Sequence, residues 1–588
     1  MVPASRRSLA SDGVAAFAPG YVEGPHAAGS GVTTFARADA TSATVFWPML
    51  AVLAWFSFSM AWRGLAPPDE GRYIGVAYEM LRSGDWVVPT LDGLPFFHKP
   101  PLFYWIAATS LHVFGLHDWA GRVPSLIGAS AAAFALYAFT RRWSGSTRGR
   151  SALLVLVTQP GFFLGAQFAN LDMLVAGGMS VTIVAVAHAV LLLSAASSAG
   201  RESSGGAAAT PTLRDLANAR RWLVAGWAAA ALGVLAKGLI GLVLPGLVIL
   251  AWLLFTRRLR LLTQLLWWPG PLLFLAVAAP WFVAMQLRFR DFFDYFIVEQ
   301  HFRRFAGSGF NNAHSFWFYV PVVLLMLAPW SPWLVNAWRG RKTREATEPA
   351  GTIRILMWTW TLVIVGFFSL PASKLVGYVL AALPPLAWII MDAARSPPGR
   401  VETDGAALAA RWWRSTAICA AIVCVAVGAL AARYQPRGAG AIAERLALKH
   451  ADGEPVFMLD TYLYDLPFKA RLQQPVRVID DWLDPDLPRR DNFRKELFDA
   501  GRFAPSAASR TLVNRADAAA SMCDAPVSWI VGAKSAADRY PFLANLEPQA
   551  EEGDRTLWRL DRATSAWPTS GCSTPGRAKA TSPATQHQ

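Results

Sequence analysis

The chain has 588 residues and a formal net charge of +15, and 54% of its residues are hydrophobic while only 16% are charged. Soluble proteins carry roughly 25% charged residues, so this composition excludes an ordinary soluble globular protein. Apolar runs of about 17 to 25 residues are long enough to cross a bilayer. They predict an all-α, polytopic membrane protein, and the excess arginine then belongs to short loops beside apolar runs rather than to nucleic-acid binding.

Residues 1–44 are rich in Ala, Gly, Ser and Thr and lack the basic start and apolar core of a signal peptide. We therefore expect a disordered cytoplasmic tail. Arginine-rich clusters beside short loops mark the cytoplasmic side. Placing these clusters inside predicts about eleven crossings, near 45–62, 120–140, 151–168, 173–195, 222–236, 239–255, 264–287, 315–336, 355–370, 375–392 and 415–432.

All the unusual polar connections between the predicted spans then lie on the opposite, extracytoplasmic face. These connections are Pro67–Pro101, Ala169–Asp172, Lys237–Gly238, Arg288–His314 and Pro371–Lys374. The span assignment did not use these residues, so their gathering on one face predicts a single extracytoplasmic site.

The first outside loop, residues 63–118, is expected to contain interfacial helices. Pro67–Glu70 is a helix start at which Asp69 can cap, and early acids suit the helix dipole. An apolar stripe at helical spacing follows, and Ser83-Gly84 ends it. The stretch Asp85–Pro95 is expected to be extended because two of its residues precede proline, and a proline pair can then open a helix over Leu102–Phe114.

Eight strings of sequence together carry a resemblance to a known family. They are PDEGRY (Pro68–Tyr73), SGDWVVPTLDGLPFFHKPPLFYW (Ser83–Trp105), FGLHDWAGRVPS (Phe114–Ser125), NLDM (Asn170–Met173), LAKGLIGLVLPG (Leu235–Gly246), EQHFRRF (Glu299–Phe305), FWFYVPVVLLMLAPW (Phe316–Trp330) and FFSLPASKLVGYVLAALPPLA (Phe367–Ala387). In this order they resemble the bacterial aminoarabinose transferases that modify lipid A, which belong with the protein O-mannosyltransferases among integral-membrane glycosyltransferases of the GT-C fold. The resemblance implies about 11 to 13 transmembrane helices in a transferase domain over residues 45–432.

The resemblance also implies an activity. It points to a multi-pass enzyme of the bacterial inner membrane that moves 4-amino-4-deoxy-L-arabinose from undecaprenyl phosphate to a lipid A phosphate at the periplasmic face, a modification that gives polymyxin resistance. The alternative is a transferase of the same fold acting on protein Ser/Thr or another glycolipid. A secondary transporter fits less well because the charges lie at loop ends rather than near the bilayer midplane. The expected partners are the polyprenyl-phosphate-sugar donor, the acceptor and membrane lipids, with the chain acting as a monomer.

Such a transfer needs cations around the leaving phosphate and a carboxylate beside the oxocarbenium-like sugar. Asp69 matches the family's first-loop aspartate and is the predicted catalytic carboxylate, with Asp172 as the second; helix capping is the alternative for both. Tyr378 is expected one helical turn beyond Lys374, on the same face. The predicted donor-phosphate ligands are Arg72, Lys99, Arg304, Lys374 and Tyr378.

The remaining site predictions concern the acceptor, the sugar and a metal. Glu70 and Glu299 are expected to contact the acceptor or sugar. Lys237 is equally consistent with a lysine that snorkels to the interface, and we expect it to matter less than Lys99. His98 stands where the family commonly has Glu, and with His301 it could coordinate a divalent ion such as zinc. Two loop histidines that make hydrogen bonds are the alternative, and no other cofactor is expected.

The chain changes character beyond Arg433. Strand-like runs at Glu454–Asp460, Gln474–Asp480 and Val527–Lys534 lie between polar helical stretches. They predict a small periplasmic α/β domain over residues 433–561, followed by a disordered tail at 562–588. Cys523 and Cys572 could form a disulfide in an oxidising compartment.

Overall fold

The computed structural model describes residues 43–203, 212–303, 312–339, 349–394, 404–434, 438–489 and 491–563. The chain divides into two compact units, Met1–Trp47 and Pro48–Gln588. All contacts discussed below lie within the second unit, which contains both the predicted transferase domain and the predicted α/β domain. The two predicted disordered tails lie outside the described residues, apart from residues 43–44 and 562–563.

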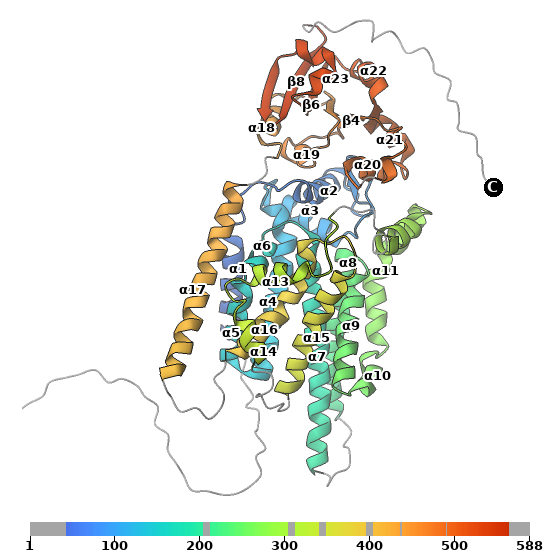
Figure 1. Cartoon of the computed structure of the whole chain (residues 1–588). Helices are drawn as coiled ribbons and strands as arrows, with labels where there is room; N and C mark the ends of the chain where they lie inside the picture. The colour runs from blue at the N-terminus through green and yellow to red at the C-terminus, as the bar shows by residue number, and fades with distance from the viewer. Residues whose placement is uncertain are drawn as a thin grey trace, which may run out of the picture. The chain divides into compact units, whose positions relative to one another are not determined.

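Long helices make up most of the second unit, and several of them run side by side in Figure 1. Among the described residues, six helices are long and apolar enough to span a membrane, and three shorter ones are also apolar. The multi-pass membrane architecture is thus confirmed, while the exact number of crossings stays a prediction. The helices at the predicted spans are α1 (Ala43–Ser57), α4 (Val123–Ser144), α5 (Ser146–Val157), α6 (Pro160–Ala166), α7 (Leu171–Ser203), α8 (Leu213–Lys237), α9 (Ile240–Phe255), α11 (Pro269–Arg288), α13 (Tyr319–Leu327), α14 (Trp333–Arg339), α15 (Ala350–Ser369), α16 (Leu383–Ala393) and α17 (Asp404–Arg433).

Two of the predicted spans are each broken into two helices. The break between α5 and α6 falls at Gln159, which is extended because Pro160 follows it. The break between α13 and α14 follows Ala328, which is also extended and precedes a proline. The Trp330 indole N–H donates to Thr158 Oγ1 at 3.0 Å, so the two breaks lie against each other.

Close helix packing at the centre of the bundle depends on glycine. A side chain at Gly128 of α4 would collide with the backbone of Met173 in α7, and one at Gly177 of α7 would collide with the backbone of Gly128. Small residues at such crossings let membrane helices approach closely. The site described below is built at the ends of α7 and α8, whose positions this packing fixes.

The first outside loop forms close to the predicted boundaries. α2 covers Asp69–Ser83 and ends at Gly84, whose φ of +73° is readily adopted only by glycine. A short hairpin, β1 (Thr90–Leu91) and β2 (Leu94–Pro95), turns at Asp92 and Gly93, both with positive φ. α3 covers Leu102–Phe114. The expected cap was wrong, because Asp69 is the first helical residue and no side chain caps α2.

The C-terminal part of the unit, orange to red in Figure 1, contains a six-stranded sheet in the order β5-β4-β3-β6-β8-β7. β3, β4, β5 and β6 are parallel, and β8 pairs antiparallel with β6 and β7. The predicted strands are present as β3 (Val456–Leu459), β4 (Arg477–Asp480) and β6 (Val527–Ala533), which confirms the small α/β domain. The structure adds β5 (Leu512–Asn514), β7 (Pro548–Glu552) and β8 (Arg555–Asp561).

The remaining elements are short. They are α10 (Leu262–Leu265), a π-helical stretch at Asp294–Arg303, a 3₁₀ turn at Val376–Ala382, and, in the C-terminal part, α18 (Gly440–Lys449), α19 (Leu466–Lys469), α20 (Phe493–Gly501), α21 (Pro505–Thr511), α22 (Ala518–Met522) and α23 (Ala536–Arg539). Cys523 is disulfide-bonded, and its predicted partner, Cys572, lies outside the described residues.

Candidate active site

Glu70, at the start of α2, joins three segments of the chain, which are residues 63–70 and the segments around Arg122 and Ala169. Its carboxylate accepts hydrogen bonds from Arg122 at 2.9 and 3.0 Å and from Arg63. It also accepts from the backbone N–H groups of Ala66 at 2.8 Å and Ala169 at 2.7 Å. Asp69 precedes Glu70, and Asp172 lies three residues after Ala169. The hydrogen bonds of Glu70 therefore bring the two predicted catalytic carboxylates into one region.

The electrostatics of Glu70 match a structural role. Burial opposes its ionisation, but the guanidinium groups of Arg122 and Arg63 outweigh burial and lower the pKa of the carboxyl to about 2. Glu70 is fully buried and so is Arg122. The prediction that Glu70 contacts the acceptor or sugar therefore does not fit this geometry, since its oxygens are occupied by protein donors.

Asp69 and Arg72 form the first functional pair. Arg72 Nη2 lies 2.7 Å from Asp69 Oδ1, one helical turn away, and the Asp69 side chain keeps 45% of its surface exposed. Arg72 also pairs with Glu496 of α20, which in turn accepts from the Tyr464 hydroxyl at 2.6 Å. Within the described part of the chain, Arg72 Nε is buried without a hydrogen-bond partner. An accessible carboxylate and a guanidinium with an unused donor thus lie side by side.

Asp172 and Lys237 form the second pair, at the N-terminus of α7 and the C-terminus of α8. Their side chains make an ion pair in which each is 12% exposed. The Lys237 ammonium also lies 4.4 Å from the centre of the Tyr378 ring, within the range of a cation–π contact. Asp172 is not a helix cap, because Asn170 Oδ1 accepts from the backbone N–H groups of Asp172 and Met173.

Tyr73 follows Arg72 on α2, and its ring contacts those of Phe103 and Tyr104. Burial raises the pKa of its hydroxyl, and the charges of both Asp69 and Asp172 raise it further against the opposing effect of Arg72. These effects agree with the hydrogen bond from the Ala169 N–H to Glu70, which brings the start of α2 to the start of α7. The structure therefore places Asp69, Arg72, Asp172 and Tyr378 in one region, together with Lys237, Tyr73 and Glu496, while their roles stay predictions.

Lys237 is the main correction to the predicted ranking of lysines. It was expected to be free to snorkel into water, whereas it is held by Asp172 and Tyr378. Lys99 is half-buried in the turn between β2 and α3. The basis for expecting Lys99 to matter more than Lys237 is therefore lost.

Lys374 is placed differently from the prediction. It precedes the 3₁₀ turn Val376–Ala382, so it does not share a helical face with Tyr378. Its ammonium is buried and donates to the carbonyls of His314, at 2.9 Å, and Pro371. These bonds join the segment before α13 to the segment after α15 and match a structural role.

One predicted metal residue, His98, and one predicted acceptor residue, Glu299, lie in or against the π-helical stretch Asp294–Arg303. His98 is buried, and its Nε2 lies 2.8 Å from the Tyr295 hydroxyl, as in the hydrogen-bonding alternative. Glu299 Oε1 lies 3.7 Å from Lys495 Nζ of α20. Within the described ranges, no group of three His, Cys, Asp or Glu side chains could hold a metal ion. The His301 side chain and Arg304 lie outside the described residues, so zinc binding and the role of Arg304 stay predictions.

The chain resembles known proteins both in sequence and in fold. Residues 98–196 match the family described as dolichyl-phosphate-mannose-protein mannosyltransferase. The chain is 31% identical over 355 residues to an undecaprenyl phosphate-alpha-4-amino-4-deoxy-L-arabinose arabinosyl transferase of Pseudomonas savastanoi, covering 59% of this chain and 60% of the relative. It is 32% identical over 335 residues to the transferase of the same name from Pseudomonas aeruginosa PAO1, covering 56% and 55%.

The solved structures extend the likeness to the whole fold. The crystal structure of ArnT from Cupriavidus metallidurans bound to undecaprenyl phosphate superposes with a TM-score of 0.70 at 23% identity, covering 88% of this chain and 98% of that one. The apo form gives a TM-score of 0.69 at 22% identity, with 89% and 98% covered. The chain has the GT-C fold and is similar in sequence to the aminoarabinose transferases. The matched sequence spans a little over half the length of these curated relatives.

The fold comparison covers more of the chain than the sequence comparison. The family model includes Asp172 and the Ala169 backbone that Glu70 binds, but it begins after Asp69. The resemblance expected from the eight strings of sequence is confirmed, and so is the GT-C architecture.

Proposed function

We propose that the chain transfers 4-amino-4-deoxy-L-arabinose from undecaprenyl phosphate to a phosphate of lipid A, at the periplasmic face of the bacterial inner membrane, and that it acts as a monomer. The observation that carries the proposal is that two carboxylate–cation pairs, Asp69–Arg72 and Asp172–Lys237, are held in one region by the hydrogen bond between Glu70 and Ala169. The names of the sequence relatives support the same donor sugar.

In the proposed reaction, the bond between the anomeric carbon and the donor phosphate oxygen breaks, and undecaprenyl phosphate leaves with the electron pair. Arg72 and Lys237 are the cations that stabilise the leaving phosphate through their charge. Asp69 is the accessible carboxylate that stabilises positive charge on the sugar.

The new bond forms between the anomeric carbon and an oxygen of the acceptor. A lipid A phosphate has a second pKa near about 6 and is largely ionised at neutral pH, so it can attack without losing a proton to the enzyme. In that case Asp69 acts through its charge alone. A hydroxyl acceptor would instead need Asp69 as a general base.

A second candidate function is favoured by the family match over residues 98–196. It is the transfer of a hexose from a polyprenyl phosphate to protein Ser/Thr or to another glycolipid. His98 stands where the aminoarabinose transferases commonly have Glu. The identity of the transferred sugar is therefore open to this second candidate as well.

The test uses the full-length chain reconstituted in lipid nanodiscs. We expect labelled aminoarabinose to pass from its undecaprenyl phosphate donor to lipid A, with release of undecaprenyl phosphate. Polyprenyl phosphate mannose and a Ser/Thr-rich peptide serve as the matched second pair of substrates. Transfer with the second pair alone would favour the second candidate, and no transfer with either pair would contradict both proposals.

A further inference from the structure

A cavity of about 710 Å³ lies between α4, α7 and α8, far from the candidate active site. Its lining includes His188, which is 16 residues beyond Asp172 on α7 and so roughly 24 Å from it along the helix at 1.5 Å per residue. On α8 it is lined by Asn218 to Ala225, near the opposite end of that helix from Lys237. The cavity is therefore at the other end of the bundle from the two carboxylate–cation pairs.

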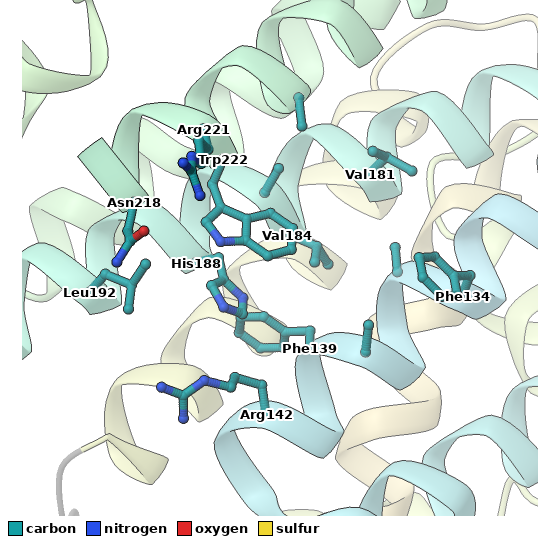
Figure 2. A pocket seen from close by; sticks show the side chains of 14 residues that line it. Phe134, Phe139, Arg142, Val181, Val184, His188, Leu192, Asn218, Arg221 and Trp222 are labelled. Carbon is teal, nitrogen blue, oxygen red and sulfur yellow. The ribbon is translucent and has the colours of Figure 1, made fainter. Parts of the chain in front are cut away.

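The two ends of this cavity differ in chemistry. Figure 2 shows Arg142 and Arg221 on opposite sides of His188, whereas Phe134 and Val181 lie farther along the cavity. α4 and α8 follow the same order, with polar lining residues toward one end and small or apolar ones toward the other, and on α7 Leu192 lies beyond His188 at the polar end. The cavity thus has a cationic end and an apolar end.

No residue that the structure describes accepts a hydrogen bond from the guanidinium groups at the cationic end. Among the described residues, no carboxylate lies within ion-pair distance of Arg142 or Arg221. The Trp143 indole N–H donates to His188 Nδ1 at 3.3 Å, so neutral His188 carries its proton on Nε2. His188 is only 6% exposed, and Trp222 stacks on it with ring centres 4.2 Å apart. One cavity is thus lined by a buried imidazole and by two exposed guanidinium groups, all of them able to donate to an anion.

We propose that this cavity binds an anionic phospholipid, with its phosphate between Arg142, Arg221 and His188 and an acyl chain along the apolar end. Guanidinium groups match phosphate geometry and lose less solvation energy than ammonium groups. Basic pockets between membrane helices are suited to anionic lipid headgroups. An anion of the donor type is a poorer fit, because its phosphate would lie about 24 Å from the reacting groups.

The experiment measures lipid retention by native mass spectrometry of the full chain purified from nanodiscs of phosphatidylglycerol or phosphatidylcholine. We expect the wild type to retain phosphatidylglycerol but not phosphatidylcholine. The double variant Arg142→Gln/Arg221→Gln should lose retention by about tenfold or more, the effect expected for lost charge-assisted hydrogen bonds. The control Arg214→Gln/Arg260→Gln removes the same charge from exposed residues that do not line the cavity and should retain the lipid.

A further variant tests the apolar end without changing charge. Ala138→Trp adds bulk at a half-buried lining position and should also reduce retention while the circular dichroism spectrum is unchanged. Equal loss in both arginine doubles would mean a general attraction of anionic lipid to a basic surface and would overturn the proposal. So would equal retention of both lipids, or full retention by Ala138→Trp.

Discussion

Lys237 and Asp172 are the pair whose chemistry depends most on mutual contact. Both side chains are largely buried, and a buried charge that loses its partner is strongly destabilised. Each member is therefore expected to depend on the other, both for stability and for orientation toward the substrate.

We predict that Lys237→Met lowers the transfer rate by about 10- to 150-fold, which corresponds to roughly 1.5–3 kcal/mol for a charge-assisted contact. Asp172→Asn should have a similar effect, and the double variant should lose little more than either single variant, as coupled residues do. Transfer kinetics with a fixed donor measure this. The control variant Lys534→Met breaks an exposed ion pair with Glu551 and should leave the rate unchanged. If the losses of Lys237→Met and Asp172→Asn add up in their double variant, the two residues are not coupled.

These residue contacts were only partly predictable from the sequence. Asp69 and Arg72 are three residues apart on one helix, so local spacing could identify them. Lys237 and Asp172 are 65 residues apart, and Arg72 and Glu496 are 424 apart; no pattern in a single sequence pairs such residues. A lysine directly before glycine at the end of an apolar run was the one available signal, and it also fits a snorkelling residue.

The hairpin β1–β2 joins the first outside loop to the C-terminal part of the unit. Asp92 at its turn is buried, and its Oδ1 accepts from the Val476 N–H at 2.8 Å. Burial raises the pKa of Asp92 well above its ordinary value, and the charge of Glu79 raises it further. Because the folded state then binds a proton more tightly than the unfolded state, stability is present at low pH and falls as pH rises above the unfolded pKa near about 3.9.

We predict that Asp92→Asn raises the melting temperature by a few degrees at pH 8. The amide keeps the acceptor for Val476 and also tolerates the φ of +55° at this position. The difference from wild type should shrink toward pH 4, where the Asp92 carboxyl is protonated. The exposed Asp452→Asn is the control and should show no change at either pH; a lower melting temperature for Asp92→Asn at pH 8 would contradict the assignment.

At the element scale, the glycine and proline residues that end or begin helices made the first outside loop predictable. Gly84 ends α2, and the proline pair before Leu102 opens α3, because these residues restrict the backbone locally. The same rules missed β7, whose sequence PQAEE carries no apolar pattern. That strand exists because β8 provides a partner edge, which is a tertiary cause.

The whole molecule is predicted to have one catalytic face. The contact between Arg72 and Glu496 and the contact between Asp92 and Val476 join the first outside loop to the C-terminal part. Reporter fusions measure which side each segment faces. Fusions at Arg148 and Arg258 should report cytoplasm, and fusions at Lys99 and after Arg433 should report periplasm. A fusion at Lys99 that reports the same side as Arg258 would contradict the prediction of one periplasmic catalytic face.

The most direct test of the account is mass spectrometry of lipid A from cells that lack the gene and are complemented with wild type or with Asp69→Asn. Asp69→Asn removes the accessible charge at nearly constant volume, so we expect the protein to be inserted normally but to be inactive. The account predicts lipid A heavier by one pentosamine with the wild type and unmodified lipid A with the variant. Pentosamine addition at wild-type level by Asp69→Asn, or none by the wild type, would contradict it.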